Sequence, residues 1–256
     1  MNFAELMQPK KPLSHLKAVA GTIQFQQKVF EAQKSIERLM KLSNRPIISC
    51  GGGKDSTAIA ILAKSVNPDT YVICANPPNP LPDREPHNSE LKKYLGGTWI
   101  DLPYDWDVDA VLDGDNPYPA GLKMKLLKEF QSDNEIDGIV MGVRAAESKG
   151  RLINYRIRGD LYKVDDGWRC TPIVTFTAEE SLAVALLHDA PINPVYEKTH
   201  LAPNYEYLRD GTWWCHSTQY ADAVGGWVKH YYPDYYNKYM ASVAIQGNAK
   251  SRVCTY

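Results

Sequence analysis

The residues best suited to chemistry lie in one short stretch, in which an apolar run leads into glycines, a lysine and hydroxyl side chains. The stretch reads Ile47-Ile48-Ser49-Cys50-Gly51-Gly52-Gly53-Lys54-Asp55-Ser56-Thr57. Glycine has no Cβ, so a run of glycines lets the backbone turn sharply and come close to a ligand. Lys54 supplies a full positive charge directly after the glycines. A loop of this kind is typical of a phosphate-binding site.

The elements on either side of the glycines must position this loop. Residues 46–50 form an apolar run with the length of a buried strand. Apolar residues then recur at helical spacing from Ala58 to Val66, which predicts a helix that begins near Asp55 or Ser56. The free N–H groups and positive dipole end of this helix would attract an anion. The predicted phosphate-binding residues are Ser49, Gly51, Gly52, Gly53, Lys54, Asp55, Ser56 and Thr57.

Two common phosphate loops do not fit this stretch. The Walker A pattern requires a glycine five positions before its Gly-Lys pair, and Ile48 stands there. The Rossmann pattern Gly-x-Gly-x-x-Gly fits Gly51 and Gly53, but its third glycine position holds Ser56. An ordinary glycine-rich turn between a strand and a helix is the non-functional alternative.

Length and composition exclude several other classes of protein. With 256 residues and a hydrophobic fraction of 44%, the chain can form one large α/β domain or a domain with an appendage. The net charge of −1 does not indicate bulk electrostatic binding of nucleic acid. No apolar run reaches the length of a membrane span, and residues 1–12 do not resemble a signal peptide. We therefore expect no membrane partner and a cytoplasmic location.

The five cysteines are scattered and include no Cys-x-x-Cys pair. This spacing argues against a disulfide scaffold or a zinc ribbon. No iron–sulfur cluster is expected, because such a cluster would need four close thiolates. Cys50 and Cys74 fall in predicted strands and are interpreted as small buried hydrophobic residues.

Strand-like and helical patterns alternate along the chain, which is typical of an α/β fold. Strands are predicted over 70–74, 98–102 and 137–143. Helices are predicted over 22–42, 85–95 and 121–130, and a further helix is predicted to begin at a capping box of Thr177 and Glu180.

The loop 75–83 includes Asn76 and contains four prolines, which exclude helix and sheet there. It follows a predicted strand, and open α/β sheets bind ligands beyond the carboxyl ends of their strands. The loop is therefore interpreted either as a wall of a ligand pocket or as a rigid crossover.

A second informative stretch begins at the end of strand 137–143. Arg144 follows that strand directly, next to Gly142, where a sheet of this type presents ligand-binding groups. A guanidinium there can bind phosphate or sulfate through two hydrogen bonds. Arg151 could add a second guanidinium, and Glu147 could orient either arginine. The alternative is a surface ion-pair cluster that contributes about 0–1 kcal/mol.

Three motifs together resemble one superfamily. Gly51 to Ser56 resembles the PP-loop Ser-Gly-Gly-Lys-Asp-Ser of ATP pyrophosphatases and adenine nucleotide α-hydrolases, with Gly51 in place of the leading serine. Residues 142–151 resemble the Gly-x-Arg-x-x-Glu-Ser-x-x-Arg segment of the phosphoadenosine phosphosulfate (PAPS) reductase superfamily. A third segment of that superfamily is similar to Trp168, Pro172-Ile173 and Asn193-Pro194-Val195-Tyr196, with Phe176 where tryptophan is usual.

The resemblance covers roughly residues 45–198 and implies a fold. The expected architecture is α/β, with a doubly wound parallel five-stranded sheet of order 3-2-1-4-5 and helices on both faces. The expected domains are an N-terminal helical segment (1–44), a PP-loop adenine-nucleotide-binding domain (45–198) and an aromatic-rich C-terminal extension (199–256).

The resemblance also implies an activity. The expected enzyme binds ATP, with Mg²⁺ in contact with Asp55, and cleaves the bond between the α- and β-phosphates. It transfers the adenylyl group to an unknown acceptor and releases pyrophosphate. Lys54, Arg144 and Arg151 are the predicted catalytic residues, and Asn76, Gly142 and Glu147 join the loop residues in the predicted nucleotide site.

Two alternatives stay open. The first is a reductase of adenylyl sulfate or PAPS with Cys254 as the nucleophile, although the Glu-Cys-Gly-Leu-His motif of such reductases is missing and Cys215 stands alone. The second is a non-catalytic nucleotide-binding subunit, which Gly51 and the aromatic extension favour. That extension could bind a protein partner or a second copy of the chain, and its aromatic side chains could stack on nucleic acid bases.

Overall fold

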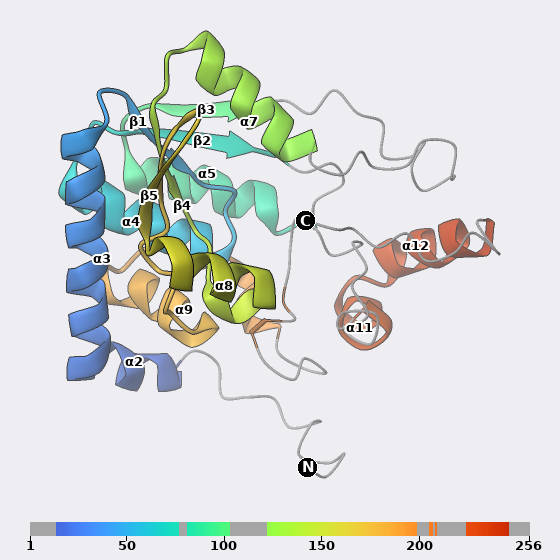
Figure 1. Cartoon of the computed structure of the whole chain (residues 1–256). Helices are drawn as coiled ribbons and strands as arrows, with labels where there is room; N and C mark the ends of the chain where they lie inside the picture. The colour runs from blue at the N-terminus through green and yellow to red at the C-terminus, as the bar shows by residue number, and fades with distance from the viewer. Residues whose placement is uncertain are drawn as a thin grey trace.

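The computed structural model describes residues 14–76, 81–102, 122–198, 205–206, 208 and 224–245. The strands of this part of the chain are β1 (Pro46–Ser49), β2 (Tyr71–Ala75), β3 (Trp99–Leu102), β4 (Gly138–Met141), β5 (Leu161–Val164) and β6 (Gly167–Cys170). They form a six-stranded sheet of order β3-β2-β1-β4-β6-β5 at the centre of the fold (Figure 1).

The prediction of a five-stranded parallel sheet is wrong in the number and direction of the strands. The strands β3, β2, β1, β4 and β6 are parallel, and they follow the predicted order when β6 takes the fifth place. The additional strand β5 pairs with β6 in the antiparallel sense. A two-residue turn, Asp165-Asp166, joins these strands, and antiparallel neighbours can be joined by so short a turn.

Helices cover both faces of the sheet (Figure 1). Within the described residues, no helix combines the length and the apolar composition needed to cross a membrane. The α-helices are α2 (Ser14–Ala20), α3 (Ile23–Leu42), α4 (Lys54–Val66), α5 (Arg84–Leu95), α7 (Leu122–Asp133), α8 (Lys149–Arg158), α9 (Ala178–Leu187), α11 (Lys229–Tyr231) and α12 (Pro233–Ile245). Two short 3-10 helices, η1 (Ala145–Glu147) and η2 (Pro194–Glu197), and one π-helix, η3 (Val224–Val228), complete the set in this part of the chain.

Side chains of the strands alternate between the two faces of the sheet, so each face needs its own helical layer. Ile48 and Val140 belong to a core that includes buried side chains of α3, α4 and α9. Their neighbours Ile47 and Ile139 belong to a second core with Leu127 of α7. The sheet thus holds α4, the helix that follows the glycine loop, against its first face.

Part of the described C-terminal region packs against α9. Trp227 and Tyr232 are buried in one apolar cluster with Leu182 of α9 and with Tyr205. Helix α12 extends away from the sheet (Figure 1). The buried aromatic residues therefore serve packing, while binding of a partner by the region 199–256 and the predicted domain boundaries stay predictions.

Candidate functional site

The glycine loop connects β1 to α4 in a conformation that depends on glycine. Gly52 has a φ of +78°, in the left-handed region that side chains rarely adopt. A Cβ on Gly52 would lie 2.0 Å from Oδ1 of Asn88. The hydroxyl of Ser56 accepts a hydrogen bond from Gly51 N–H at 3.2 Å and donates one to the carbonyl of Gly53 at 3.0 Å. The serine side chain thus folds back and braces the loop.

Helix α4 begins at this loop without a side-chain cap of its own. Its N-cap residue is Gly53, which has no side chain to accept a hydrogen bond. Instead, the hydroxyl of Tyr196, on η2, accepts the backbone N–H of Lys54 at 2.7 Å. The motif Asn193-Pro194-Val195-Tyr196 therefore touches the start of the helix.

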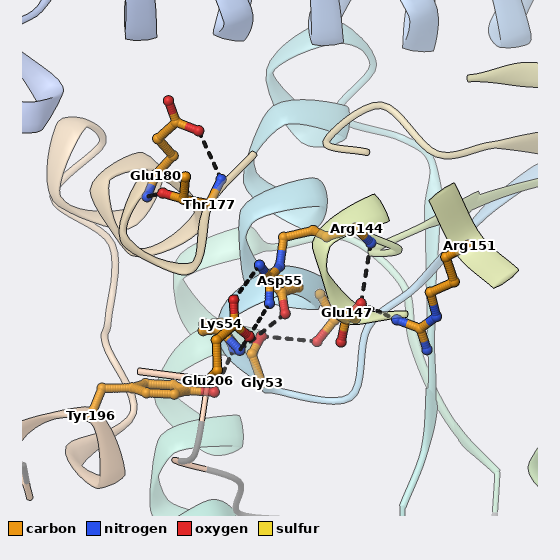
Figure 2. A network of polar contacts seen from close by, with 11 residues as sticks. Gly53, Lys54, Asp55, Arg144, Glu147, Arg151, Thr177, Glu180, Tyr196 and Glu206 are labelled. Carbon is orange, nitrogen blue, oxygen red and sulfur yellow. Dashed lines mark hydrogen bonds and ion pairs between the residues drawn. The ribbon is translucent and has the colours of Figure 1, made fainter. Parts of the chain in front are cut away.

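Four charged side chains converge beside the loop (Figure 2). Arg144 Nε lies 2.6 Å from Asp55 Oδ1. Arg144 Nη1 and Nη2 donate to the two carboxylate oxygens of Glu206 at 2.6 and 2.5 Å. Lys54 Nζ lies 3.2 Å from Asp55 Oδ2 and 3.8 Å from Glu206 Oε2. The cluster thus consists of two cations and two carboxylates.

The cluster is charged at neutral pH. Burial alone would raise the pKa of Asp55, but the charges of Lys54 and Arg144 outweigh it and lower that pKa. The pKa of Glu206 is lowered in the same way, since hydrogen bonds from Arg144 and the charges of Lys54 and Arg144 outweigh burial. Burial would lower the pKa of Arg144, yet Glu206 and Asp55 raise it above its ordinary value.

Gly142 explains how Arg144 reaches the loop. A Cβ on Gly142 would lie 2.8 Å from the backbone carbonyl of Asp55 and 2.9 Å from Ser56 N. The chain leaving β4 therefore passes directly against the first turn of α4, and Arg144 follows two residues later. The order of the strands reverses between β1 and β4, and open α/β sheets bind ligands at such a point.

Arg151 and Glu147 lie beside this cluster and not within it (Figure 2). Glu147 Oε2 accepts the backbone N–H of Arg144 at 3.2 Å and also pairs with Nη1 of Arg151. Glu147 thus links the backbone of one arginine to the side chain of the other. In contrast to the buried Arg144, the side chain of Arg151 is 35% exposed.

The other predicted residues, Ser49, Thr57 and Asn76, do not belong to the charged cluster. Ser49 ends β1 and is aligned with Met141 of β4. Thr57 is buried on the side of α4 that faces α9, and it lines a small cavity there. Asn76 follows β2 and donates to Asp101 Oδ1 at 3.1 Å.

Two residues near the loop have no counterpart in the predicted site. Glu206 stands 62 positions after Arg144, so no local spacing relates the two. Arg84, on α5, is buried, and its Nη2 lies 3.4 Å from the position of a Cβ on Gly51. Arg84 comes directly after the proline-rich loop 75–83, and that place in the sequence is a signal that could have indicated it.

The structure does not favour the predicted contact between Asp55 and Mg²⁺. Both carboxylate oxygens of Asp55 face a cation, Arg144 on one side and Lys54 on the other. A Mg²⁺ ligand needs an oxygen that faces the metal. Among the described residues, no three His, Cys, Asp or Glu side chains gather as a metal site. The residues present do not fit a Mg²⁺ site centred on Asp55.

The described cysteines are not placed for catalysis. Cys50, Cys74 and Cys170 are buried and form no disulfide. Burial raises the pKa of Cys170, which disfavours its thiolate. The candidate nucleophile Cys254 and the lone Cys215 lie outside the described residues.

Comparison with solved structures identifies proteins of the same fold. The structure of Candida glabrata FMN adenylyltransferase in complex with FMN and the ATP analogue AMPCPP matches with a TM-score of 0.52 and 16% identity, over 75% of this chain and 68% of that one. PAPS reductase from Candida auris, in a phosphate complex, matches with a TM-score of 0.53 and 10% identity, over 78% and 94% of the two chains. No protein-family model and no curated protein matches the sequence. The fold of this chain is thus similar to the folds of FMN adenylyltransferase and PAPS reductase.

Proposed function

We propose that this protein binds ATP at the loop of residues 51–56 and cleaves it between the α- and β-phosphates. The observation that carries the proposal is the meeting of three features at one point of the sheet. A glycine loop with a left-handed residue opens a helix, Lys54 begins that helix, and the buried Arg144 reaches the same place from β4. Helix N-termini with an added cation bind phosphate groups.

The roles of the residues follow from where charge develops. An acceptor oxygen attacks the α-phosphorus and gives up to solvent any proton it carries, and the bond from that phosphorus to the oxygen bridging the α- and β-phosphates breaks. The bonding electrons leave with pyrophosphate, which gains negative charge. Lys54 and the N–H groups of the loop stabilise this charge, and Arg144 stabilises the charge on the phosphate next to it. The adenylyl group remains on the acceptor.

The solved structures support an adenine nucleotide as the ligand. The matched FMN adenylyltransferase structure contains an ATP analogue and FMN, so that protein binds an adenine nucleotide on the same fold. The acceptor used by this chain is not given by the shared fold, because one fold hosts many reactions. An acceptor oxygen that attacks the α-phosphorus is all that the proposal requires.

Two preparations of ATP, labelled at the α- or at the γ-phosphate, test the proposal. The reactions are run with Mg²⁺ in the buffer. We expect the α label to appear in AMP or in an adenylylated product, and the γ label to appear in pyrophosphate. Lys54→Ala should lower the rate by about 100-fold or more, because a preorganised donor to the developing charge is lost. Lys125→Ala, which removes a cation that is 72% exposed on α7, should leave the rate unchanged. Release of the γ label as orthophosphate would contradict the proposal.

The reductase alternative is the second candidate, because a PAPS reductase shares the fold over 94% of its own length. It places adenylyl sulfate or PAPS on the same loop and requires Cys254, outside the described residues, as the nucleophile. Arg144 would then face the sulfate. The two candidates differ in the nucleotide that binds, and that difference can be measured directly.

A further inference from the structure

The guanidinium of Arg144 already holds an anion, and the anion is a side chain of this chain. Its two terminal nitrogens donate to the two oxygens of Glu206, at 2.6 and 2.5 Å. Its third nitrogen, Nε, faces Asp55 at 2.6 Å, and the arginine side chain is 0% exposed. A paired contact of this kind is the same geometry with which arginine binds phosphate. The carboxylate of Glu206 therefore occupies the place where two oxygens of a phosphate group would bind to Arg144.

The charges of the cluster cancel while Glu206 is in place. Lys54 and Arg144 are balanced by Asp55 and Glu206, and the environment favours the ionised form of both carboxylates. A polyphosphate carries several negative charges and is attracted by a net positive site. One carboxylate must leave before the cluster becomes such a site.

Glu206 is the more exposed of the two carboxylates. Asp55 lies in the first turn of α4, pairs with a cation through each oxygen, and has a side chain that is 14% exposed. The side chain of Glu206 is 30% exposed, and Glu206 lies outside α4, the helix that carries Asp55. Tyr205 and Leu208, close to Glu206 in the sequence, are buried in the apolar cluster that contains Trp227. This packing holds both residues in place on either side of Glu206. Release of Arg144 would require a rotation of the Glu206 side chain.

We propose that Glu206 is an internal competitor for the anion subsite formed by Lys54 and Arg144, and that a phosphate group of the substrate must displace it. The inference rests on the proposed function, since it assigns the same loop to phosphate. It makes Glu206 a specificity-determining residue, because a singly charged anion competes poorly with a carboxylate that is already in place. It also gives pyrophosphate a route of release, in which Glu206 returns to Arg144 as the product leaves.

Calorimetric titration with inorganic pyrophosphate tests the proposal on the full chain. Pyrophosphate is the probe because it engages the anion subsite without an adenine. Glu206→Gln keeps the size of the side chain and removes its charge, so it should bind pyrophosphate about 10- to 100-fold more tightly than the wild type, the range expected for one charge-assisted contact. Glu197→Gln, which removes a carboxylate from the exposed surface of η2, is the matched control and should bind as the wild type does.

The outcomes separate this proposal from the proposed function. Equal or weaker binding by Glu206→Gln, with clear binding by the wild type, would overturn the competitor role and leave the phosphate loop intact. If neither the wild type nor Glu206→Gln nor Glu197→Gln binds pyrophosphate, both the competitor role of Glu206 and the proposed phosphate site are overturned. If Glu206→Gln does not fold, Glu206→Asp replaces it, and its shorter carboxylate should give an affinity above that of the wild type. An affinity of Glu206→Asp at or below the wild type would count against the proposal.

Discussion

At the scale of single residues, Gly52 shows most plainly how the loop depends on its sequence. Its φ of +78° is open to glycine at little cost, whereas an L side chain loses about 1–2 kcal/mol there. Asn88 of α5 lies against the place of a Cβ. Both facts explain why a glycine stands in the middle of the loop, whatever ligand the loop binds.

Gly52→Ala should therefore destabilise the protein and distort the loop. We expect a loss of about 2 kcal/mol in the free energy of unfolding, because the backbone conformation is strained and Asn88 must move. Urea denaturation measures the loss. Gly150→Ala on α8 is the matched control, since the atom nearest to its Cβ would be 3.9 Å away. A Gly52→Ala variant as stable as Gly150→Ala would show that the loop is not held in this conformation.

Site residues that belong to a local sequence motif could be predicted from the sequence, whereas site residues that only the folded structure brings together could not. Lys54 follows the glycines and Arg144 follows a predicted strand, so both could be placed at one edge of the sheet. Glu206 pairs with Arg144 although 62 positions separate them in the sequence. A single glutamate outside any motif gives no sequence signal of such a contact. The same limit applies to Arg84, which only the packing of α5 brings to the loop.

At the scale of elements, Asp137 ties the connection between α3 and β1 to the start of β4. Its carboxylate accepts hydrogen bonds from Ser43 Oγ at 2.5 Å, Asn44 N at 3.0 Å and Arg45 N at 2.9 Å. Burial would raise the pKa of Asp137, but these hydrogen bonds outweigh it and lower the pKa. The bonds thus stabilise the alignment of the two strands that carry the loop and Arg144.

Asp137→Asn should cost stability at neutral pH and cost less in acid. In the folded state the pKa is lowered, so the stabilisation is complete above the unfolded value of about 3.9 and is lost as the pH falls through the folded value. The loss at pH 7 should be on the order of 1 kcal/mol, because the bonds are partly exposed. Urea denaturation from pH 7 to pH 3 checks that the gap to the wild type narrows as the pH falls. Asp133→Asn controls for net charge, and a gap independent of pH would contradict the account.

Element prediction succeeded where hydrophobic periodicity was strong. The predicted helix 22–42 corresponds to α3 (Ile23–Leu42), and the capping box of Thr177 and Glu180 is present at the start of α9. The hairpin of β5 and β6 was missed because its strands carry the charged residues Lys163 and Arg169 and lack the apolar run that marks β1 and β4. The Asp165-Asp166-Gly167 turn was the local signal, and Gly167 has a positive φ of 124°.

At the scale of the whole molecule, the topology assembles the site from three distant parts of the chain. The site is formed by the loop after β1, the segment after β4 and Glu206 from the C-terminal region, which meet where the strand order reverses. The sequence predicted the first two parts, since parallel strands end at one edge of a sheet. The third depends on how the C-terminal residues pack on α9, which periodicity does not reveal.

The central claim, that ATP is held by this loop, is tested most directly by thermal unfolding with and without ATP, for the wild type and for Lys54→Ala. ATP at about a hundred times its dissociation constant should stabilise the wild type by roughly 2.7 kcal/mol. The midpoint should then rise by about 5–10 °C, and Lys54→Ala should lose the rise while Lys125→Ala keeps it. An equal rise in Lys54→Ala, or a rise with PAPS or adenylyl sulfate but none with ATP, would contradict the account.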